Sequence, residues 1–319
     1  MDAAPRFAII GEALIDLVDP GDDSPCLAHP GGSPYNVAIG LARLGQPTAL
    51  IARFSHDGLG SVLRDHATRS NVDLSWCVDD PSRATTTAMV SLTDGIATYH
   101  FTIEGTAGFA WTDADLVIPP TAQIVHTGSL ASWLPPGSEV IGRRLAALHE
   151  AGEVLISYDP NVRPQLQPDV DAARVQIEAT LPHTHVVKAS DEDIRWLYGA
   201  QPLESVAQLW LAAGPTLVVI TRGAAGPVAF TTDAVPLERA VRPVDVVDTV
   251  GAGDAFTSGL LDGLGRHAIT SPAALPALVG DPTMLAEVLD HAALVAALTC
   301  TRAGAAPPRW AELEVARQS

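Results

Sequence analysis

The chain has 319 residues, 47% of them hydrophobic, which is enough to bury a large α/β core. Its 37 Asp and Glu residues outnumber its 19 Lys and Arg residues, and a formal net charge of −18 disfavours nucleic acid and anionic membranes as partners. The three cysteines lie far apart in the sequence and predict neither a disulfide framework nor a zinc site.

The first residues lead directly into an apolar run at residues 7–10, without the basic segment and apolar stretch of a signal peptide. No apolar run in the sequence approaches the ~18 residues of a membrane span. We therefore expect a cytoplasmic location and no membrane partner.

A buried first strand is predicted over residues 7–18, where Asp16 interrupts the apolar residues. An ionised carboxylate in such surroundings is costly unless it has a partner or a ligand. A strand end facing solvent would explain Asp16 equally well. Asp16 is therefore a candidate binding residue with a structural alternative.

Residues 31–45 carry the signals of a capped helix, with Ser33 suited to the N-cap, Pro34 to the first helical position and Gly45 to the residue after the end. The glycine pair before the cap lets backbone approach a ligand closely. Asn36, in the first turn, offers a hydroxyl both a donor and an acceptor. A helix that only packs against a sheet would show the same capping.

Alternating strands and helices continue along the chain. A strand at residues 48–54 and a helix from 57 to about 70 indicate a βαβ unit. Two β-rich segments, 85–92 and 96–101, meet at an Asp-Gly pair at 94–95 and predict a small antiparallel flap. From residue 124 onward the pattern indicates a parallel, doubly wound sheet, with strands at 124–126, 154–158, 185–187 and 216–220 and helices near 138–149 and 171–179.

Three polar segments follow strands of this sheet, where the ligand crevice of an open parallel sheet lies. They are D-P-N-V-R at 159–163, K-A-S-D-E-D at 188–193 and T-R-G-A-A-G at 221–226. Each also has a structural explanation: an Asx turn, a helix capped by Ser190, and a hairpin turn, respectively.

A glycine-rich turn, D-T-V-G-A-G-D at residues 248–254, leads into an apolar helical pattern at 255–264. Gly251 and Gly253 allow close approach of the backbone, and the first-turn N–H groups lack intrahelical partners, so the turn can bind an anion. Asp254 can serve as a partner of the helix dipole or as a base beside the anion.

Residues 248–254 resemble the D-T-x-G-A-G-D signature of the ribokinase-like (PfkB) carbohydrate kinases, and residues 31–45 resemble the G-G-x-x-x-N-x-A-x-x-L-A-x-L-G signature of the same family. The two signatures occur in the family's order, about two hundred residues apart. The resemblance implies a doubly wound, mostly parallel α/β sheet flanked by helices, in one kinase domain over residues 1–319. A β-rich lid at residues 85–106 is expected within it.

The resemblance also implies roles for individual residues. Asp254 is the expected base for a sugar hydroxyl, beside an anion hole formed by Gly251, Ala252 and Gly253. The residues implied in sugar binding are Asp16, Gly31, Gly32, Asn36, Asn161 and Arg163. The residues implied in ATP binding are Lys188, Ser190, Thr221, Arg222, Gly223 and Gly226.

Cation sites are implied in the same way, with Mg²⁺ held near Asp193 mainly through water, and K⁺ held by Asp248, Val250 and Gly304. The sequence departs from the family here. Ser190 and Asp193 stand where the K-x-N-x-x-E pattern has Asn and Glu, and Pro308 stands where some relatives have a Ser ligand. These departures leave the exact geometry of both cation sites open.

The expected activity is ATP-dependent transfer of the γ-phosphoryl group to a primary hydroxyl of a monosaccharide. The motifs together are most similar to those of bacterial fructokinases, so fructose is the leading substrate and fructose 6-phosphate the expected product. Ribose, a nucleoside and ketodeoxygluconate remain alternatives, as does a sugar-binding or regulatory protein without turnover. An exposed flap edge could also pair with a second copy in a homodimer.

Overall fold

An eight-stranded sheet forms the centre of the computed structural model, which describes residues 3–18, 26–93, 96–232 and 234–318. Its order is β14-β13-β12-β11-β10-β9-β1-β4. The strands from β4 to β12 run parallel, and β13 and β14 are antiparallel. The strands are β1 (Phe7–Ile10), β4 (Thr48–Ile51), β9 (Ile124–Gly128), β10 (Leu155–Asp159), β11 (Val186–Ser190), β12 (Leu217–Thr221), β13 (Pro227–Phe230) and β14 (Leu237–Glu238). The predicted doubly wound sheet is confirmed.

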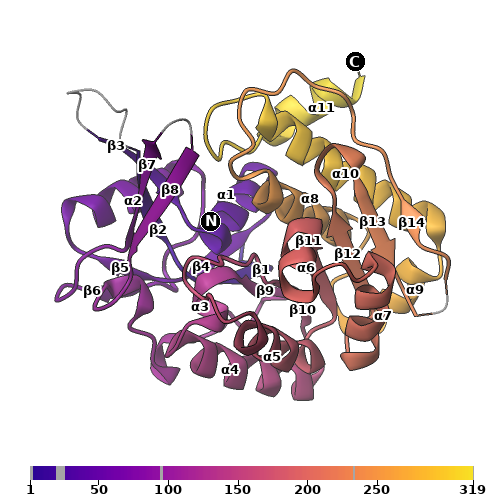
Figure 1. Cartoon of the computed structure of the whole chain (residues 1–319), viewed down its shortest axis with the longest axis horizontal. Helices are drawn as coiled ribbons and strands as arrows, with labels where there is room; N and C mark the ends of the chain where they lie inside the picture. Colours follow the sequence, from indigo (N-terminus) through magenta and orange to yellow (C-terminus); the bar gives the residue numbers. More distant parts are fainter. Residues whose placement is uncertain (1–2, 19–25, 94–95, 233, 319) are drawn as a thin grey trace.

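Helices cover both faces of this sheet (Figure 1). Successive side chains of a strand point to opposite faces, so Phe7 and Ile9 of β1 join one apolar cluster and Ala8 and Ile10 another. On the first face lie α1 (Ser33–Arg43), α8 (Ala252–Arg266) and α10 (Pro282–Cys300). On the second lie α4 (Gly137–Ala151), α5 (Val170–Thr180), α6 (Asp191–Tyr198) and α7 (Leu203–Ala213).

A second, four-stranded sheet stands to one side of the main sheet (Figure 1). Its order is β3-β2-β7-β8, with β2 (Leu14–Val18), β3 (Leu27–Gly31), β7 (Thr87–Thr93) and β8 (Ile96–Thr102). We call it the lid sheet. Strands β7 and β8 pair antiparallel within the expected flap, and β2 and β3 add two strands from outside it. The Asp-Gly pair at 94–95 lies outside the described residues.

The prediction of one strand over residues 7–18 is wrong. The chain leaves the main sheet after Ile10 and enters the lid sheet at Leu14, so Asp16 belongs to the lid sheet. Gly11, at the break, has φ +153°, and a Cβ there would collide with Pro34. Tertiary packing against the start of α1 therefore decides where the strand breaks.

Residues 48–54 also divide between two sheets, because β5 (Arg53–Ser55) leaves β4 and pairs with β6 (Val78–Asp80). Arg53 is buried there and binds the carboxylates of Asp80 and Asp115 at 2.9 and 2.6 Å. In α2 (Gly58–Arg69), the N-cap Asp57 also accepts hydrogen bonds from the backbone and hydroxyl of Thr85. Asp57 thereby links the start of α2 to the segment that leads into β7 of the lid sheet.

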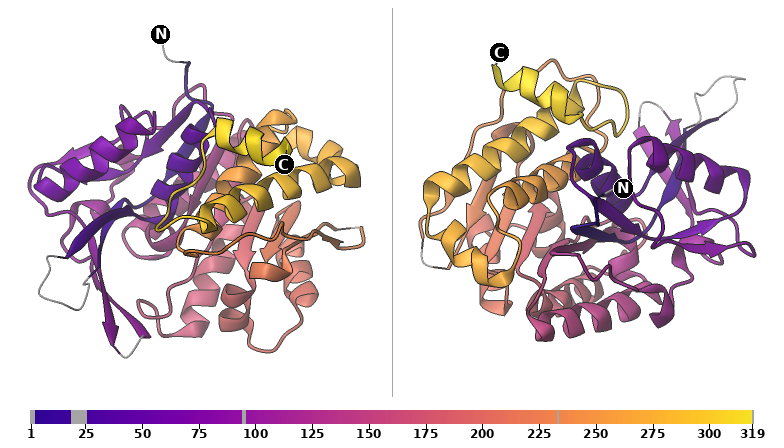
Figure 2. Two further views of the ribbon diagram at one scale, coloured as in Figure 1. Left: turned by 90° about the horizontal axis from the view of Figure 1, so that it is seen from above. Right: turned by 180° about the vertical axis from the view of Figure 1, so that it is seen from behind.

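Helix α10 packs along α8, with α11 (Trp310–Gln318) beside it near the end of the chain (Figure 2). By length and composition alone, α10 is apolar enough to cross a membrane, and half of its most apolar window is buried inside the structure. Helices in the cores of globular proteins pass the same test, so this is weak evidence for a membrane span. The sequence analysis found no apolar run of this length because polar residues interrupt α10.

Candidate active site

The glycine-rich turn begins α8, as the sequence predicts. Gly251 is the N-cap and adopts the left-handed conformation, with φ +74° and ψ 4°. A Cβ there would lie 2.5 Å from the Cβ of Ala305, so the position has neither the backbone freedom nor the space for another residue. The Ala252 N–H donates to the carbonyl oxygen of Thr249 at 3.2 Å, so this member of the expected anion hole is engaged within the turn. The other N–H groups at the start of the helix lack intrahelical partners and can face an anion, which the helix dipole also favours.

Asp254 lies in the first turn of α8 and is buried. Its Oδ1 accepts a hydrogen bond from Ser33 Oγ at 2.6 Å, and its Oδ2 accepts one from Asn36 Nδ2 at 2.8 Å. Both donors come from the first turn of α1, which can approach α8 closely because a Cβ on Gly40 would collide with the side chain of Ser258. The two signature segments, far apart in sequence, therefore meet at one carboxylate.

The prediction that Ser33 is the N-cap of α1 is wrong. Gly32 occupies the N-cap with φ +101°, and Ser33 is the first helical residue. The Ser33 hydroxyl is therefore free of the helix backbone and binds Asp254 instead. Sequence reasoning also assigned Asn36 to the sugar alone, whereas the structure shows its amide holding Asp254 in place.

Burial raises the pKa of Asp254 above its usual value. The hydrogen bonds from Ser33 and Asn36 oppose this shift, as does the positive charge of Lys188, whereas the carboxylate of Asp159 adds to it. A carboxyl group with a raised pKa binds a proton more strongly, which suits a group that must accept one.

Asp16 lies near Asp254, since the negative charge of Asp254 contributes to the raised pKa of Asp16. Burial is the main cause of that rise, to about 6, and the positive charge of Arg163 opposes it. A Cβ on Gly31 would collide with the Asp16 carboxylate, and a Cβ on Gly32 would lie 2.6 Å from the carbonyl oxygen of Glu12. The absence of side chains thus lets Gly31 lie close to Asp16 and Gly32 lie close to the backbone of Glu12.

Asn161 and Arg163 follow β10 and form a tight turn. Asn161 has φ +40°, and its N–H donates to Asp159 Oδ1 at 3.2 Å, as in the Asx turn considered from the sequence. Arg163 donates to Asn161 Oδ1 at 2.6 Å and to the carbonyl oxygen of Val162 at 2.9 Å. Its charge nevertheless reaches Asp16, so the turn faces the same region.

Glu12 belongs to this region and was missed from the sequence. It is 1% exposed, and Oε2 accepts a hydrogen bond from the N–H of Ala131 at 3.0 Å. Oε1 is buried without a hydrogen-bond partner among the described residues. Burial raises the pKa of Glu12 to about 7, against the charge of Arg163. Glu12 follows β1 directly, so the rule that weights polar residues at strand ends would have found it.

Because the folded state raises the pKa of Glu12 from 4.5 to about 7, ionising this group destabilises the fold. The stability that Glu12 contributes when protonated is therefore lost as the pH rises from about 4.5 through 7. We expect Glu12→Gln, which stays neutral, to exceed the parent in unfolding free energy at pH 8 by about 3 kcal/mol and to match it near pH 4. Urea unfolding at both pH values measures this.

The exposed Glu150 provides a control, because Glu150→Gln removes a charge from the surface of α4 without changing a buried group. Its unfolding free energy should follow that of the parent at both pH values. A constant difference between Glu12→Gln and the parent across this range would contradict a buried, titrating Glu12.

On the expected nucleotide side, Ser190 caps α6 in a reciprocal capping box with Asp193. Asp193 Oδ2 accepts from the Ser190 backbone at 2.9 Å and Oδ1 from the Val162 N–H at 2.9 Å. Both carboxylate oxygens are therefore engaged by the chain itself. Such an arrangement fits a magnesium ion held through water better than one bound directly.

Thr221 is the last residue of β12, and Arg222, Gly223 and Gly226 lie in the turn between β12 and β13. The Arg222 guanidinium donates to the carbonyl oxygen of Gly226 at 3.1 Å and pairs with Glu238 at 3.1 Å. A Cβ on Gly226 would collide with a backbone carbonyl, so this glycine is required by the turn. The geometry matches the hairpin alternative, and Arg222 closes the turn on itself.

The expected monovalent-cation residues lie in two adjacent loops. Asp248 accepts hydrogen bonds from the N–H groups of Val250 at 3.0 Å and Gly304 at 2.7 Å. The structure thus joins all three residues, with the Asp248 carboxylate between the two loops. Within the described ranges, no cluster of three or more His, Cys, Asp or Glu side chains could hold a metal ion.

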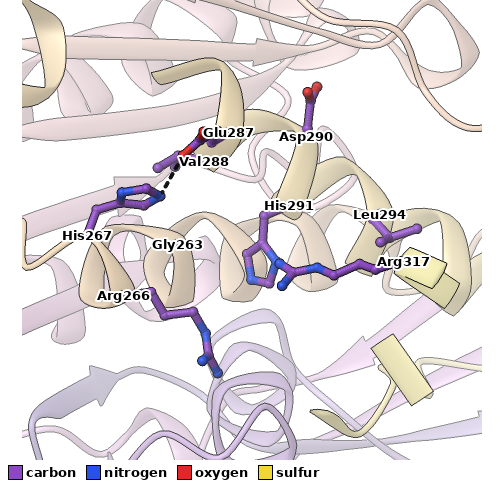
Figure 3. Close-up of a pocket in the computed structure, with 9 residues that line it drawn as sticks. All are labelled: Gly263, Arg266, His267, Glu287, Val288, Asp290, His291, Leu294 and Arg317. Atoms are coloured by element: carbon purple, nitrogen blue, oxygen red, sulfur yellow. Dashed lines mark hydrogen bonds and ion pairs between the residues drawn. The ribbon is translucent and has the colours of Figure 1, made fainter. Parts of the chain in front are cut away.

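A separate hollow of about 430 Å³ lies between the far end of α8, α10 and α11 (Figure 3). Its polar lining includes Arg266, His267, Glu287, His291 and Arg317. At 1.5 Å per helical residue, the nearest of its α8 residues, Gly263, is ~13 Å along the helix from Asp254. The hollow contains none of the residues expected from the sequence.

A doubly wound sheet with a smaller sheet beside it, and a buried carboxylate at a glycine-rich helix start, fit the class of enzymes that transfer a phosphoryl group to a small hydroxyl compound. A family model described as pfkB family carbohydrate kinase matches residues 5–312. The chain belongs to this family, and the fold is ribokinase-like.

Three proteins to which this chain is similar are fructokinases. One from Rhizobium leguminosarum bv. trifolii is 40% identical over 262 residues, covering 80% of this chain and 78% of the relative. The crystal structure of the fructokinase from Xylella fastidiosa with bound ATP has a TM-score of 0.91 at 29% identity, covering 98% of both chains. A double mutant of the fructokinase from Vibrio cholerae O395, with fructose, ADP and potassium ion bound, has a TM-score of 0.83 at 27% identity, covering 99% of both.

Proposed function

We propose that this chain is an ATP-dependent fructokinase that forms fructose 6-phosphate. The observation that carries the proposal is Asp254, a buried carboxylate held by Ser33 and Asn36 at the N-terminus of α8. The names of the relatives and the ligands of the two structural neighbours support fructose and ATP as the substrates.

In the proposed reaction, Asp254 accepts the proton of a primary hydroxyl while that oxygen attacks the γ-phosphorus. The new O–P bond forms as the bond between the γ-phosphorus and the β–γ bridging oxygen breaks, and ADP leaves. The N–H groups of Gly251 and Gly253 stabilise the charge on the transferring group, as an oxyanion hole does, and the Ala252 N–H contributes by sharing its hydrogen bond to Thr249. Positioning and charge stabilisation supply most of the catalysis in such transfers.

The sugar lies, in this proposal, between the lid sheet and the start of α1. Asp16 and Asn36 bind its hydroxyls, and the glycine pair at 31–32 lets it approach the backbone. Arg163 and Asn161 border the same space and set the far limit of the sugar. The nucleotide side is bordered by Lys188, Ser190 and the turn at 221–226.

A magnesium ion would be held near Asp193 and would neutralise part of the charge on the phosphate groups of ATP. Each oxygen of the Asp193 carboxylate already accepts a hydrogen bond from the chain, which favours contact with the ion through water. For potassium, the loops joined by Asp248 offer backbone carbonyl groups next to Gly251, and the potassium ion of the Vibrio cholerae neighbour supports this assignment.

The test is release of ADP from magnesium-ATP, with potassium present, over fructose, ribose, adenosine, ketodeoxygluconate and fructose 6-phosphate. We expect fructose to give the highest kcat/KM. ³¹P NMR of the product should show the phosphate on the 6-hydroxyl. A stronger response to ribose, adenosine or ketodeoxygluconate would replace fructose by that substrate. No turnover with any sugar, combined with measurable ATP binding, would favour a binding or regulatory protein.

A further inference from the structure

Lys188 is the only lysine in the chain, because the other 18 of its 19 basic residues are arginines. It lies in β11 and is 3% exposed. Lysine carries a compact point charge, whereas arginine carries a broad planar group that is weakly hydrated. All other basic residues of the chain are arginines, so the single lysine stands at a buried position beside the candidate active site.

The Lys188 ammonium is held on the inner side of the first turn of α8. Nζ lies 2.9 Å from Asp159 Oδ2, and Thr257 Oγ1 lies 3.3 Å from that same oxygen. A Cβ built on Gly253 would lie 3.2 Å from Nζ, so the ammonium approaches the anion-binding turn where a side chain is missing. The direct hydrogen bond of Lys188 is made to Asp159, inside the protein.

Several charges face Asp254 from the elements around it. Asp159 from β10 and Asp16 from β2 interact with Asp254, and the positive charge of Lys188 lowers the pKa of Asp254. Asp193 from α6 interacts with Lys188. A base surrounded by other carboxylates would take up a proton and lose its function. The neighbouring carboxylates in turn raise the pKa of Lys188, although burial alone would lower it, so its charge persists.

We propose that Lys188 is a positioning residue whose ammonium, fixed by Asp159, keeps Asp254 in the carboxylate form and supports the anion-binding turn from inside the protein. It acts through Asp254 and Gly253 and does not bind a phosphate of the nucleotide. The proposal rests on the proposed kinase reaction, but one of its two tests does not depend on turnover.

The first test is the pH dependence of kcat. Lys188→Met removes a positive charge from beside the base and should move the acidic limb of the profile to higher pH by about one unit. Asp159→Asn removes a negative charge and should move the limb to lower pH. In the double variant the limb should lie between the two. This variant removes both partners of the Lys188–Asp159 ion pair together, so neither is left buried without the other, which protects the test if Lys188→Met folds poorly.

A matched control is Asp262→Asn, on the same helix. Asp262 is fully buried and binds Arg266 and His291, so its loss should destabilise the protein without moving the acidic limb. If Lys188→Met instead raised KM for ATP and left the limb in place, Lys188 would be a phosphate ligand and the proposal would be wrong. Thermal unfolding of each variant separates loss of structure from loss of catalysis.

The second test uses the single lysine directly. Protein labelled with ¹³Cε-lysine should give one lysine resonance, which Lys188→Arg removes. We expect Asp159→Asn and Asp254→Asn to shift this resonance more than saturation with the magnesium complex of the β,γ-imido analogue of ATP does. A larger shift with the nucleotide would overturn the proposal, and the result holds whichever sugar the enzyme uses.

Discussion

We expect Asp254→Asn to lower kcat by a factor on the order of 10² to 10⁴, because the amide cannot accept the proton of the attacking hydroxyl. The fold should survive. Asn36 can still donate to the amide oxygen, and the Ser33 hydroxyl can turn to accept a hydrogen bond from the new N–H group. Steady-state kinetics with fructose and magnesium-ATP measure the change.

Binding of ATP provides the control, because the proposed role of Asp254 is to act on the sugar hydroxyl and not on the nucleotide. Titration calorimetry should give the same Kd for ATP in the parent and in Asp254→Asn. Turnover close to that of the parent, in a folded variant, would exclude Asp254 as the base.

The second large effect is expected from Gly251→Ala. The left-handed backbone costs a non-glycine residue roughly 1 to 2 kcal/mol, and the new Cβ would collide with Ala305. The turn must therefore shift, which misplaces the N–H groups proposed to stabilise the transferring phosphoryl group. We expect kcat to fall by a factor on the order of 10² to 10³, the usual effect of losing such a donor.

Gly45→Ala is the matched control for strain. Gly45 follows α1 with φ +88°, and a Cβ there meets no atom within 4 Å. Its alanine variant should lose a similar amount of stability and keep its kcat. An equal loss of kcat in both variants would mean that general destabilisation, and not the position of the anion-binding turn, explains Gly251→Ala.

The sequence predicts those parts of the site that depend on local chemistry. The turn before α8 could be recognised because glycines, a carboxylate and an apolar helical pattern follow one another directly in the chain. The parallel sheet could be recognised because its strands are buried and apolar on both faces. The boundaries of α2 and α4 agree with the structure to within one or two residues.

Other features depend on contacts between distant segments and could not be read from the sequence. The break between β1 and β2 follows from the contact of Gly11 with Pro34, and the place of Ser33 follows from Asp254, 221 residues away. Asp193 satisfies a local capping pattern, so nothing in the sequence indicated its hydrogen bond from the Val162 N–H. In each case a neighbour from another element determines what the residue does.

The two sides of the proposed sugar site belong to different sheets. Asp16 lies on β2 of the lid sheet, whereas Asn36 lies in α1, packed on the main sheet. An acceptor that binds both must span the boundary between them. Water is too small to bridge that boundary. In the proposed reaction, the size of the acceptor would therefore discriminate against hydrolysis of ATP, without any difference in the reactivity of the hydroxyl group.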